Sequence, residues 1–229
     1  ANAKTIRNLP LRIGVTSDGH VGTVPQKLVL RGEVLFTDAN FKRFNEQVVA
    51  KGEQAYVNAR NAASGSLKQK YPTITASRPL SFYAYDIMYI SGNYMPKTHS
   101  EALDYMGRLG LDAVGFSRVE QGIDKVARAL DEWVTYRKSF GFETDGVVIK
   151  INGIHLNDSL GFSGKDPRGS VAFKFAAEEA ITRLKAVVWT VGRSGRLTPN
   201  AVLEPVFLGG TTISAASLHN MDTIKKIGI

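Results

Sequence analysis

Six stretches of the chain have the apolar composition of β-strands. They are rich in branched aliphatic and aromatic side chains, and turn-forming residues border most of them. In chain order they are residues 27–36, 79–90, 147–152, 171–175, 183–191 and 201–208. The last four follow one another without a helical pattern between them, so the second part of the chain is expected to be richer in sheet.

Four further stretches predict helices: residues 37–52, 60–69, 99–110 and 122–139. In the first, Phe41, Phe44 and Val48 form an apolar stripe, Thr37 or Asp38 can cap the start, and a glycine at position 52 ends it. Residues 60–69 are small, which suits a helix packed closely against a neighbour. In the last stretch, the stripe is expected to consist of Ile123, Val126, Ala127, Leu130, Trp133 and Val134.

This order of elements predicts an α+β fold, with a sheet-containing body followed by a β-rich tail. Residues 176–179 are the best candidate boundary between the two parts. The segment SDGHVG (17–22) predicts a loop and lacks the length and context of a phosphate-binding loop.

Three predicted strands carry a charged side chain where alternation would otherwise place apolar groups. Lys150 interrupts VVIKIN, Lys174 interrupts VAFKF, and Arg31 and Glu33 lie in LVLRGEVLF. Burying a lone charge is costly, so the three strands could converge on one polar pocket in which an anion such as phosphate lies between the lysines. Glu33 could then accept a hydrogen bond from a ribose hydroxyl. The alternative is three ordinary strands, each with one solvated face.

Composition limits the classes of protein that remain. The chain has 229 residues, 43% of them hydrophobic, which is enough for a core and argues against disorder. The absence of cysteine excludes disulfides, thiolate zinc sites and thiol nucleophiles within these residues. A net charge of +8 favours a polyanionic partner without identifying it. No apolar run is long enough for a membrane-spanning helix.

Other basic and aromatic positions suit nucleic acid, although each also has a structural explanation. Arg60 and Lys68 lie about two helical turns apart in the predicted helix 60–69 and could reach phosphate, or could simply face solvent. Arg193 and Arg196 lie in the turn GRSGRL, which suits backbone phosphate contact or plain hairpin chemistry. Tyr85 could stack on a base or pack in the core.

Taken in order, LVLRGEVLF, NARNAASGSLKQ, SFYAYDI, ETDGVVIKIN, VAFKF and VGRSGRLTPNAVLEPVFLGGTTISAASLHN strongly resemble the bacterial NAD-dependent DNA ligases. The resemblance implies a nucleotidyltransferase (ATP-grasp-like) antiparallel-sheet core over residues 1–177, incomplete at its N-terminus. It also implies part of an OB-fold β-barrel over residues 178–229. The long match through GRSGRLTPNAVLEPVFLGGTT favours this family over the RNA-joining and capping nucleotidyltransferases.

The resemblance also assigns roles to individual residues. Lys150 would line the adenylate pocket, and Lys174 would contact the adenylate phosphate. Glu33 would bind the ribose and Tyr85 would pack on adenine. Asp145 would support the later chemistry and hold Mg²⁺, provided that it lies in the turn before its strand, because simple alternation places it opposite Lys150.

For DNA, the resemblance implies contacts from Arg60, Lys68 and Arg137, and the turn arginines Arg193 and Arg196 are candidates as well. The family usually has arginine at the position of Lys68, so a bidentate phosphate contact is lost there. The implied cofactors are NAD and Mg²⁺, and the implied partner is nicked duplex DNA.

The family's nucleophile, the lysine of a Lys-x-Asp-Gly motif, has no counterpart in these residues: TSDG (16–19) and ETDG (143–146) lack the lysine. We therefore expect a fragment or a subunit of a split ligase that is inactive in self-adenylation alone. A second polypeptide is expected to supply the nucleophile, and another could complete the OB fold. Unpaired strand edges are expected around residues 202–208.

The alternative function is a non-catalytic DNA-binding module derived from a ligase. It would bind nicked duplex with a steep salt dependence, and neither NAD nor AMP would stabilise it. Either function is expected in the cytoplasm of a bacterial or phage-infected cell, without a membrane partner.

Overall fold

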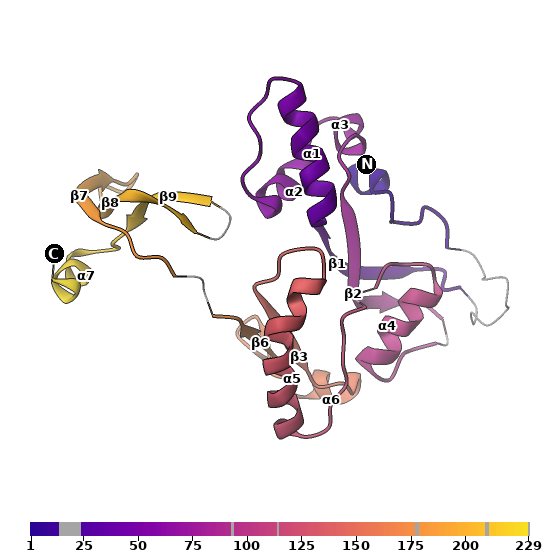
Figure 1. Cartoon of the computed structure of the whole chain (residues 1–229). Helices are drawn as coiled ribbons and strands as arrows, with labels where there is room; N and C mark the ends of the chain where they lie inside the picture. Colours follow the sequence, from indigo (N-terminus) through magenta and orange to yellow (C-terminus); the bar gives the residue numbers. More distant parts are fainter. Residues whose placement is uncertain (14–23, 93, 114, 177–178, 209–210, 229) are drawn as a thin grey trace. The chain divides into compact units, whose positions relative to one another are not determined.

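The computed structural model describes residues 1–13, 24–92, 94–113, 115–176, 179–208 and 211–228 (Figure 1). The chain divides into two compact units, Ala1–Phe175 and Ala176–Ile229. The loop predicted at residues 17–22 and the boundary predicted between residues 177 and 178 lie outside the described residues. Helix and sheet are mixed, as the sequence pattern predicts.

The first unit is built around an antiparallel pair of strands, β1 (Leu28–Leu35) and β2 (Ser81–Ile90). Helices α1 (Asp38–Ala50), α2 (Ala59–Leu67) and α3 (Pro72–Ala76) lie between these strands in the sequence. One core cluster packs α1 and α2 beside β1. Its buried members are Ile6, Phe36, Phe44, Val48, Ala62, Ala63 and Leu80.

A second core cluster joins β2 to helix α4 (His99–Arg108). Its buried members are Ala84, Ile90, Tyr105, Met106, Leu109 and Leu111. Met106 is completely buried, so α4 is firmly seated on β2. This seating matters for the site, because β2 carries several of its residues.

The predicted stripe of α1 is confirmed, since Phe44 and Val48 are buried and Phe41 packs against them. Thr37 is the N-cap, and its hydroxyl accepts a hydrogen bond from the backbone N–H of Asn40 at 3.3 Å. Within the part of the chain that the structure describes, no helix has the length and apolarity needed to cross a membrane.

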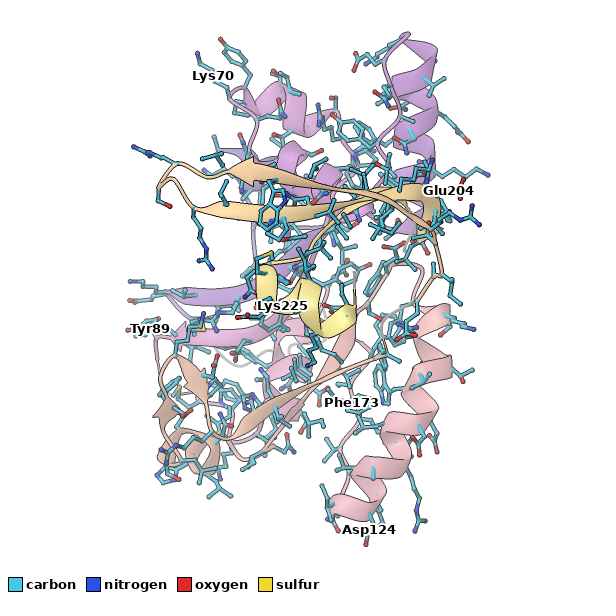
Figure 2. The ribbon with its side chains drawn as sticks, turned by 90° about the vertical axis from the view of Figure 1, so that its left-hand side faces the viewer. Lys70, Tyr89, Asp124, Phe173, Glu204 and Lys225 are labelled. Atoms are coloured by element: carbon cyan, nitrogen blue, oxygen red, sulfur yellow. The ribbon has the colours of Figure 1, made fainter. Side chains whose placement is uncertain are left out.

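The remaining part of the first unit carries a second, shorter ladder of β3 (Gly146–Lys150) and β6 (Ser170–Lys174). Helix α5 (Ile123–Tyr136) and a 3-10 turn at Arg137–Ser139 precede it. Helix α6 (Ile154–Ser159) and the two-residue strands β4 (Phe162–Ser163) and β5 (Asp166–Pro167) connect its strands. Figure 2 labels Phe173 of β6 and Asp124 of α5 among the side chains.

The predicted stripe of α5 is partly wrong. Ile123 is 78% exposed and Val134 is 43% exposed, and Ala127 is exposed as well. The covered face consists instead of Val126, Ala129, Leu130 and Trp133. These positions also repeat with the helical period, but their stripe is rotated around the helix by part of a turn from the predicted one. Periodicity alone therefore did not determine which face of α5 is covered.

The second unit is a three-stranded antiparallel sheet in the order β7 (Leu184–Val191), β8 (Leu197–Leu208) and β9 (Thr211–Ser217), followed by helix α7 (Met221–Ile227). The prediction of unpaired edges is wrong for Val202, which pairs with both Ala186 and Ala215. It holds for Val206, Phe207 and Leu208, which pair with β9 alone in the described sheet. β8 is longer than predicted because it continues through Pro199 toward the turn.

Candidate nucleotide-binding site

A β-bulge in β2 shapes one wall of the site. Arg31 pairs with Asp86 and the next residue, Gly32, pairs with Ala84, so Tyr85 is an extra residue without a partner on β1. Such a bulge bends the strand and redirects its side chains, which explains how adjacent residues can both approach one neighbour. A Cβ at Gly32 would lie 2.5 Å from the Tyr83 carbonyl oxygen and even closer to the Phe82 ring.

Lys150 meets this bulge from β3. Its ammonium lies 3.9 Å from the Asp86 carboxylate and 5.7 Å from the centroid of the Tyr85 ring. The side chains of Lys150 and Asp86 are only 27% and 23% exposed. Lys150 is therefore a partly covered cation held by a carboxylate and an aromatic face, rather than a lysine on an ordinary solvated strand.

Lys174 has a different carboxylate partner. Its ammonium donates a hydrogen bond to Asp145 Oδ2 at 3.2 Å, and both side chains are more than 70% exposed, at 72% and 73%. Asp145 precedes β3 in the chain, as its predicted role requires, and its carbonyl accepts a bond from the Phe175 N–H at 3.0 Å. The hydrogen bond from Lys174 lowers the pKa of Asp145, with a smaller contribution from the charge of Arg60.

The strand register places both lysines on one face. Gly146 pairs with Lys174 and Lys150 pairs with Ser170, and residues directly opposite each other share a face. Four residues of strand therefore separate the lysines, or about 13 Å along β3. Each lysine has a carboxylate partner of its own in the structure, and an anion between the two lysines stays a prediction.

Gly146 allows the ladder to form next to the lysines. A Cβ there would lie 3.0 Å from Lys174 Cα and closer to the Phe173 carbonyl oxygen. The glycines of the sequence motifs RGE and DGVVIK are thus both required by close backbone approach. Both positions lie directly beside residues of the predicted site.

Glu33 and Arg31 lie on the exposed face of β1, which alternates as the sequence predicts. The charges of both residues influence the pKa of Tyr85. Burial has the largest effect and raises this pKa, the charge of Arg31 lowers it, and the charges of Glu33 and Asp86 raise it. The structure therefore gathers Glu33, Tyr85 and Lys150 into one region, and Lys174 and Asp145 into a second region on the same strand pair.

Two residues near Lys150 were missed by the sequence reasoning. Asp86 could have been noticed as the single acidic residue in the apolar segment 79–90. His99 gave no signal, since it is one of four scattered histidines and reaches the site only through the fold. Its Nε2 is buried without a hydrogen-bond partner in the described structure. Burial and then the charge of Lys150 lower its pKa, against smaller opposite effects of Asp86 and Asp158.

The predicted DNA-contacting residues are spread over both units. Arg60 lies in the first turn of α2, and Lys68 is the C-cap of that helix. Lys68 makes no ion pair with any other residue that the structure describes. Arg137 donates a hydrogen bond to the Thr144 carbonyl at 3.2 Å and lies 4.5 Å from the centroid of the Phe175 ring. Arg193 and Arg196 lie in the β7–β8 turn of the second unit.

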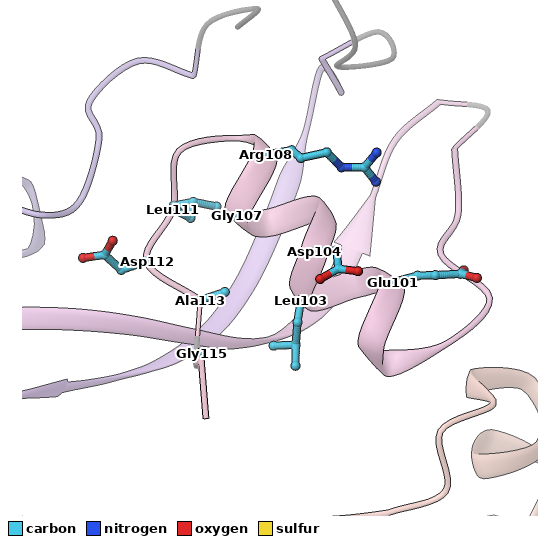
Figure 3. Close-up of a pocket in the computed structure, with 9 residues that line it drawn as sticks. All are labelled: Glu101, Leu103, Asp104, Gly107, Arg108, Leu111, Asp112, Ala113 and Gly115. Carbon is cyan, nitrogen blue, oxygen red and sulfur yellow. The ribbon is translucent and has the colours of Figure 1, made fainter. Parts of the chain in front are cut away.

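A pocket on the described residues lies elsewhere. It has a volume of about 780 Å³ and is lined by α4 and the segment after it, with Glu101, Asp104, Arg108 and Asp112 among its polar residues (Figure 3). It contains none of the predicted site residues. The lysine face is instead an open strand surface, on which Val148 is 60% exposed.

A metal ion would find few protein ligands in this unit. No group of three or more His, Asp or Glu side chains that could hold a metal is found among the described residues. Mg²⁺ is commonly held by one or two carboxylates together with substrate phosphates, so a single exposed Asp145 is compatible with it only when a phosphate is also present.

Comparison with known proteins assigns both units. The sequence model of the NAD-dependent DNA ligase adenylation domain matches residues 1–178, and that of the NAD-dependent DNA ligase OB-fold domain matches residues 181–229. The chain therefore belongs to the NAD-dependent DNA ligase family.

Curated relatives agree with this assignment. The chain is 44% identical over 235 residues to a DNA ligase of Roseiflexus sp. (strain RS-1), a match that covers 99% of the chain and 32% of the relative. It is 42% identical over 228 residues to the DNA ligase of Thermomicrobium roseum, covering 100% of the chain and 32% of that relative. The chain spans about a third of the length of these relatives.

Proposed function

We propose that the chain acts as part of an NAD-dependent DNA ligase that seals nicks in duplex DNA through enzyme–AMP and DNA–AMP intermediates. One observation carries the proposal: Lys150 and Lys174 lie on the same face of the β3–β6 ladder, and Lys150 lies against the ring of Tyr85. An aromatic ring next to one cation, with a second cation further along the strand, suits a nucleotide with a base at one end and a phosphate at the other.

In this arrangement the adenine packs on Tyr85 beside Lys150, and the Glu33 carboxylate accepts a hydrogen bond from a ribose hydroxyl. Lys174 binds the phosphate. Because its ion pair with Asp145 is exposed to solvent, the ammonium can exchange that partner for phosphate oxygens at little cost. Lys150 keeps its place, since its side chain is mostly covered.

The reaction joins a lysine nitrogen to the α-phosphorus of NAD and breaks the phosphorus–oxygen bond to nicotinamide mononucleotide, which leaves. AMP then passes to the 5′-phosphate of the nick, and attack by the 3′-hydroxyl releases it. Lys174 stabilises negative charge on the transferring phosphorus. Asp145, together with substrate phosphate oxygens, would hold Mg²⁺, which supplies further charge neutralisation when bound.

DNA contacts are proposed for Arg60, Lys68 and Arg137 near the nick and for Arg193 and Arg196 of the second unit. Arg60 acts electrostatically on Asp145, which supports a place for the nick phosphate near Lys174. Arg193 and Arg196 are exposed in their turn, so their guanidinium groups are available for phosphate contact.

The proposed domains are a nucleotidyltransferase (ATP-grasp-like) antiparallel-sheet core at residues 1–177 and part of an OB-fold β-barrel at residues 178–229. Matches at residues 1–178 and 181–229 support a division close to this position. Since the 229 residues contain no Lys-x-Asp-Gly motif, a further segment or a second polypeptide is proposed to supply the nucleophile.

A complementation assay tests this function. The chain is mixed with NAD, Mg²⁺, a nicked duplex with a labelled 5′-phosphate, and a polypeptide that carries the Lys-x-Asp-Gly segment. We expect sealing only when both polypeptides are present, and loss of sealing with Lys174→Ala. Intact mass measurement of the chain alone with NAD is expected to show no added AMP.

Two results would contradict the proposal. Sealing or an AMP adduct with the chain alone would show that its own residues supply the nucleophile. Salt-dependent binding of nicked duplex, without sealing in any mixture and without stabilisation by AMP, would favour the non-catalytic DNA-binding module instead.

A further inference from the structure

The segment that follows β3, residues 152–154, is joined to the start of α4 by a compact set of hydrogen bonds. The Asn152 carbonyl accepts a bond from the His99 N–H at 2.8 Å, and the Lys97 carbonyl accepts one from the Ile154 N–H at 3.0 Å. A β-bridge pairs the residues between them, Thr98 and Gly153. The two segments are more than fifty residues apart in the sequence, so this junction, which we call the clasp, is a tertiary contact.

The side chain of Asn152 adds two bonds to the clasp. Its Oδ1 accepts a hydrogen bond from the Ser100 N–H at 3.1 Å, and its Nδ2 donates one to the Ser100 hydroxyl at 3.2 Å. Its backbone and side chain thus satisfy the first two N–H groups of α4. The Thr98 hydroxyl accepts a bond from the third, at Glu101, and the Thr98 carbonyl accepts the first ordinary helical bond, from the Ala102 N–H. The first three N–H groups of α4, which have no partner within the helix, are therefore all bonded, two of them to Asn152 in the distant segment after β3.

The clasp connects the two walls of the candidate nucleotide site. α4 is seated on β2 through Met106 and Tyr105, and β2 carries Tyr85 and Asp86. Asn152 is two residues beyond Lys150 on the same chain segment. β3 pairs with β6 and has no ladder with β2 in the described structure, so α4 and Asn152 help to set the distance between Lys150 and its partners on β2, beside the contact of the Tyr83 and Phe142 rings before β3.

We propose that Asn152 is a positioning residue, which holds the Lys150 ammonium against Tyr85 and Asp86 by fixing the segment after β3 to the start of α4. It does not touch the nucleotide and acts through Lys150. The functional consequence, tighter binding of adenine nucleotide, rests on the function proposed above, whereas the placement of Lys150 does not.

Chemical labelling of lysines measures this placement without any ligand. Under limiting acylation, mapped by peptide mass spectrometry, Lys150 is expected to react more slowly than Lys174, in line with side-chain exposures of 27% and 72%. Asn152→Ala should raise the Lys150 rate toward that of Lys174, about a threefold change if rate follows exposure. The rate of Lys174 is the internal reference and should not change.

Two further variants separate positioning from general stability. In Asn152→Asp, one carboxylate oxygen can still accept a hydrogen bond from the Ser100 N–H, and the other can accept one from the Ser100 hydroxyl. Lys150 should therefore be labelled as slowly in this variant as in the wild type. Asn45→Ala is the matched control, because the side-chain amide of Asn45 also makes two hydrogen bonds, both to the backbone of Tyr56, at 2.7 and 2.8 Å. It should leave the Lys150 rate unchanged.

Each outcome decides the proposal. A rise confined to Lys150 in Asn152→Ala, reversed in Asn152→Asp, supports it. An unchanged Lys150 rate, or equal rises at Lys150 and Lys174, overturns it, the second by showing a general loosening of the unit.

Titration with AMP then tests the functional consequence separately. If the wild-type chain binds AMP, Asn152→Ala should weaken binding several-fold and Asn45→Ala should not. Failure of the wild-type chain to bind AMP would count against the proposed function, while the labelling result would still decide the placement of Lys150.

Discussion

At the scale of residues, the two lysines of the site are in different environments. Lys150 is largely covered and lies between a carboxylate and an aromatic ring, whereas Lys174 and its partner Asp145 are mostly in water. An exposed ion pair contributes little to stability and is easily exchanged, whereas a covered one is costly to break. Lys150 is thus suited to fixed recognition, and Lys174 to a phosphate that arrives and leaves.

His99 should make the stability of the first unit depend on pH. Because burial and Lys150 lower its pKa below the ordinary 6.5, the unfolded chain binds a proton more readily than the folded one. The free energy of unfolding should therefore be highest above pH 6.5 and fall as the pH decreases from there toward the folded pKa.

Urea unfolding at a series of pH values measures this effect. His99→Gln should reduce the loss of stability over that interval, and His155→Gln on α6 is the control that should retain it. A slope that is the same in wild type and His99→Gln would show that His99 is not responsible.

The sequence predicted which residues carry charge into the strands, but not how those charges are satisfied. Alternation in VVIKIN and VAFKF placed Lys150 and Lys174 correctly on their strands, and the ladder register confirms that they share a face. Asp86 was missed as the partner of Lys150 because the pairing depends on the bulge at Tyr85 and on the seating of α4, neither of which is local in sequence.

At the scale of elements, two glycines allow neighbouring strands to approach closely, because glycine has no side chain. Gly32 in β1 and Gly146 in β3 each face a neighbouring backbone at a distance that a Cβ would violate. Other glycines have no such role: Gly65 in α2 and Gly107 in α4 have open space where a Cβ would lie. The same substitution should therefore have opposite effects at these two kinds of position.

Gly32→Ala is expected to lower the free energy of unfolding by about 1–3 kcal/mol, because the added methyl group would meet the Phe82 ring and the Tyr83 carbonyl. Gly107→Ala is the control and should raise it by about 0.5–1 kcal/mol, the ordinary gain for replacing a helical glycine. Chemical unfolding of both variants measures the difference. A stable Gly32→Ala protein would contradict the close approach of β1 and β2.

Element positions were predictable where a pattern had a single interpretation. The stripe of α1 and the strands around Lys150 and Lys174 follow directly from their sequences. The covered face of α5 was only partly predicted because several rotations satisfy its period, and burial chose the one through Ala129. α6 and α7 were not predicted, since helices of six and seven residues leave too short a pattern.

At the scale of the whole molecule, the chain combines a candidate nucleotide site in one unit with a basic hairpin turn in the other. The net charge of +8 is consistent with a polyanionic substrate, and matches to adenylation and OB-fold domains of NAD-dependent DNA ligases cover all residues except 179 and 180. Composition favours a polyanionic partner without identifying it, and the ordered motifs predicted the family correctly. Neither could give the arrangement of charges around the lysines, which depends on tertiary contacts.

Calorimetric titration of the chain with AMP is the most direct test of the central claim, that Lys150 and Lys174 form one adenylate site. We expect saturable binding that weakens about tenfold or more in both Lys150→Ala and Lys174→Ala, since each removes a charged contact. Lys42→Ala on α1, which removes the same charge, should bind as tightly as wild type. Equal affinity in all four proteins, or no binding by the wild-type chain, would contradict it.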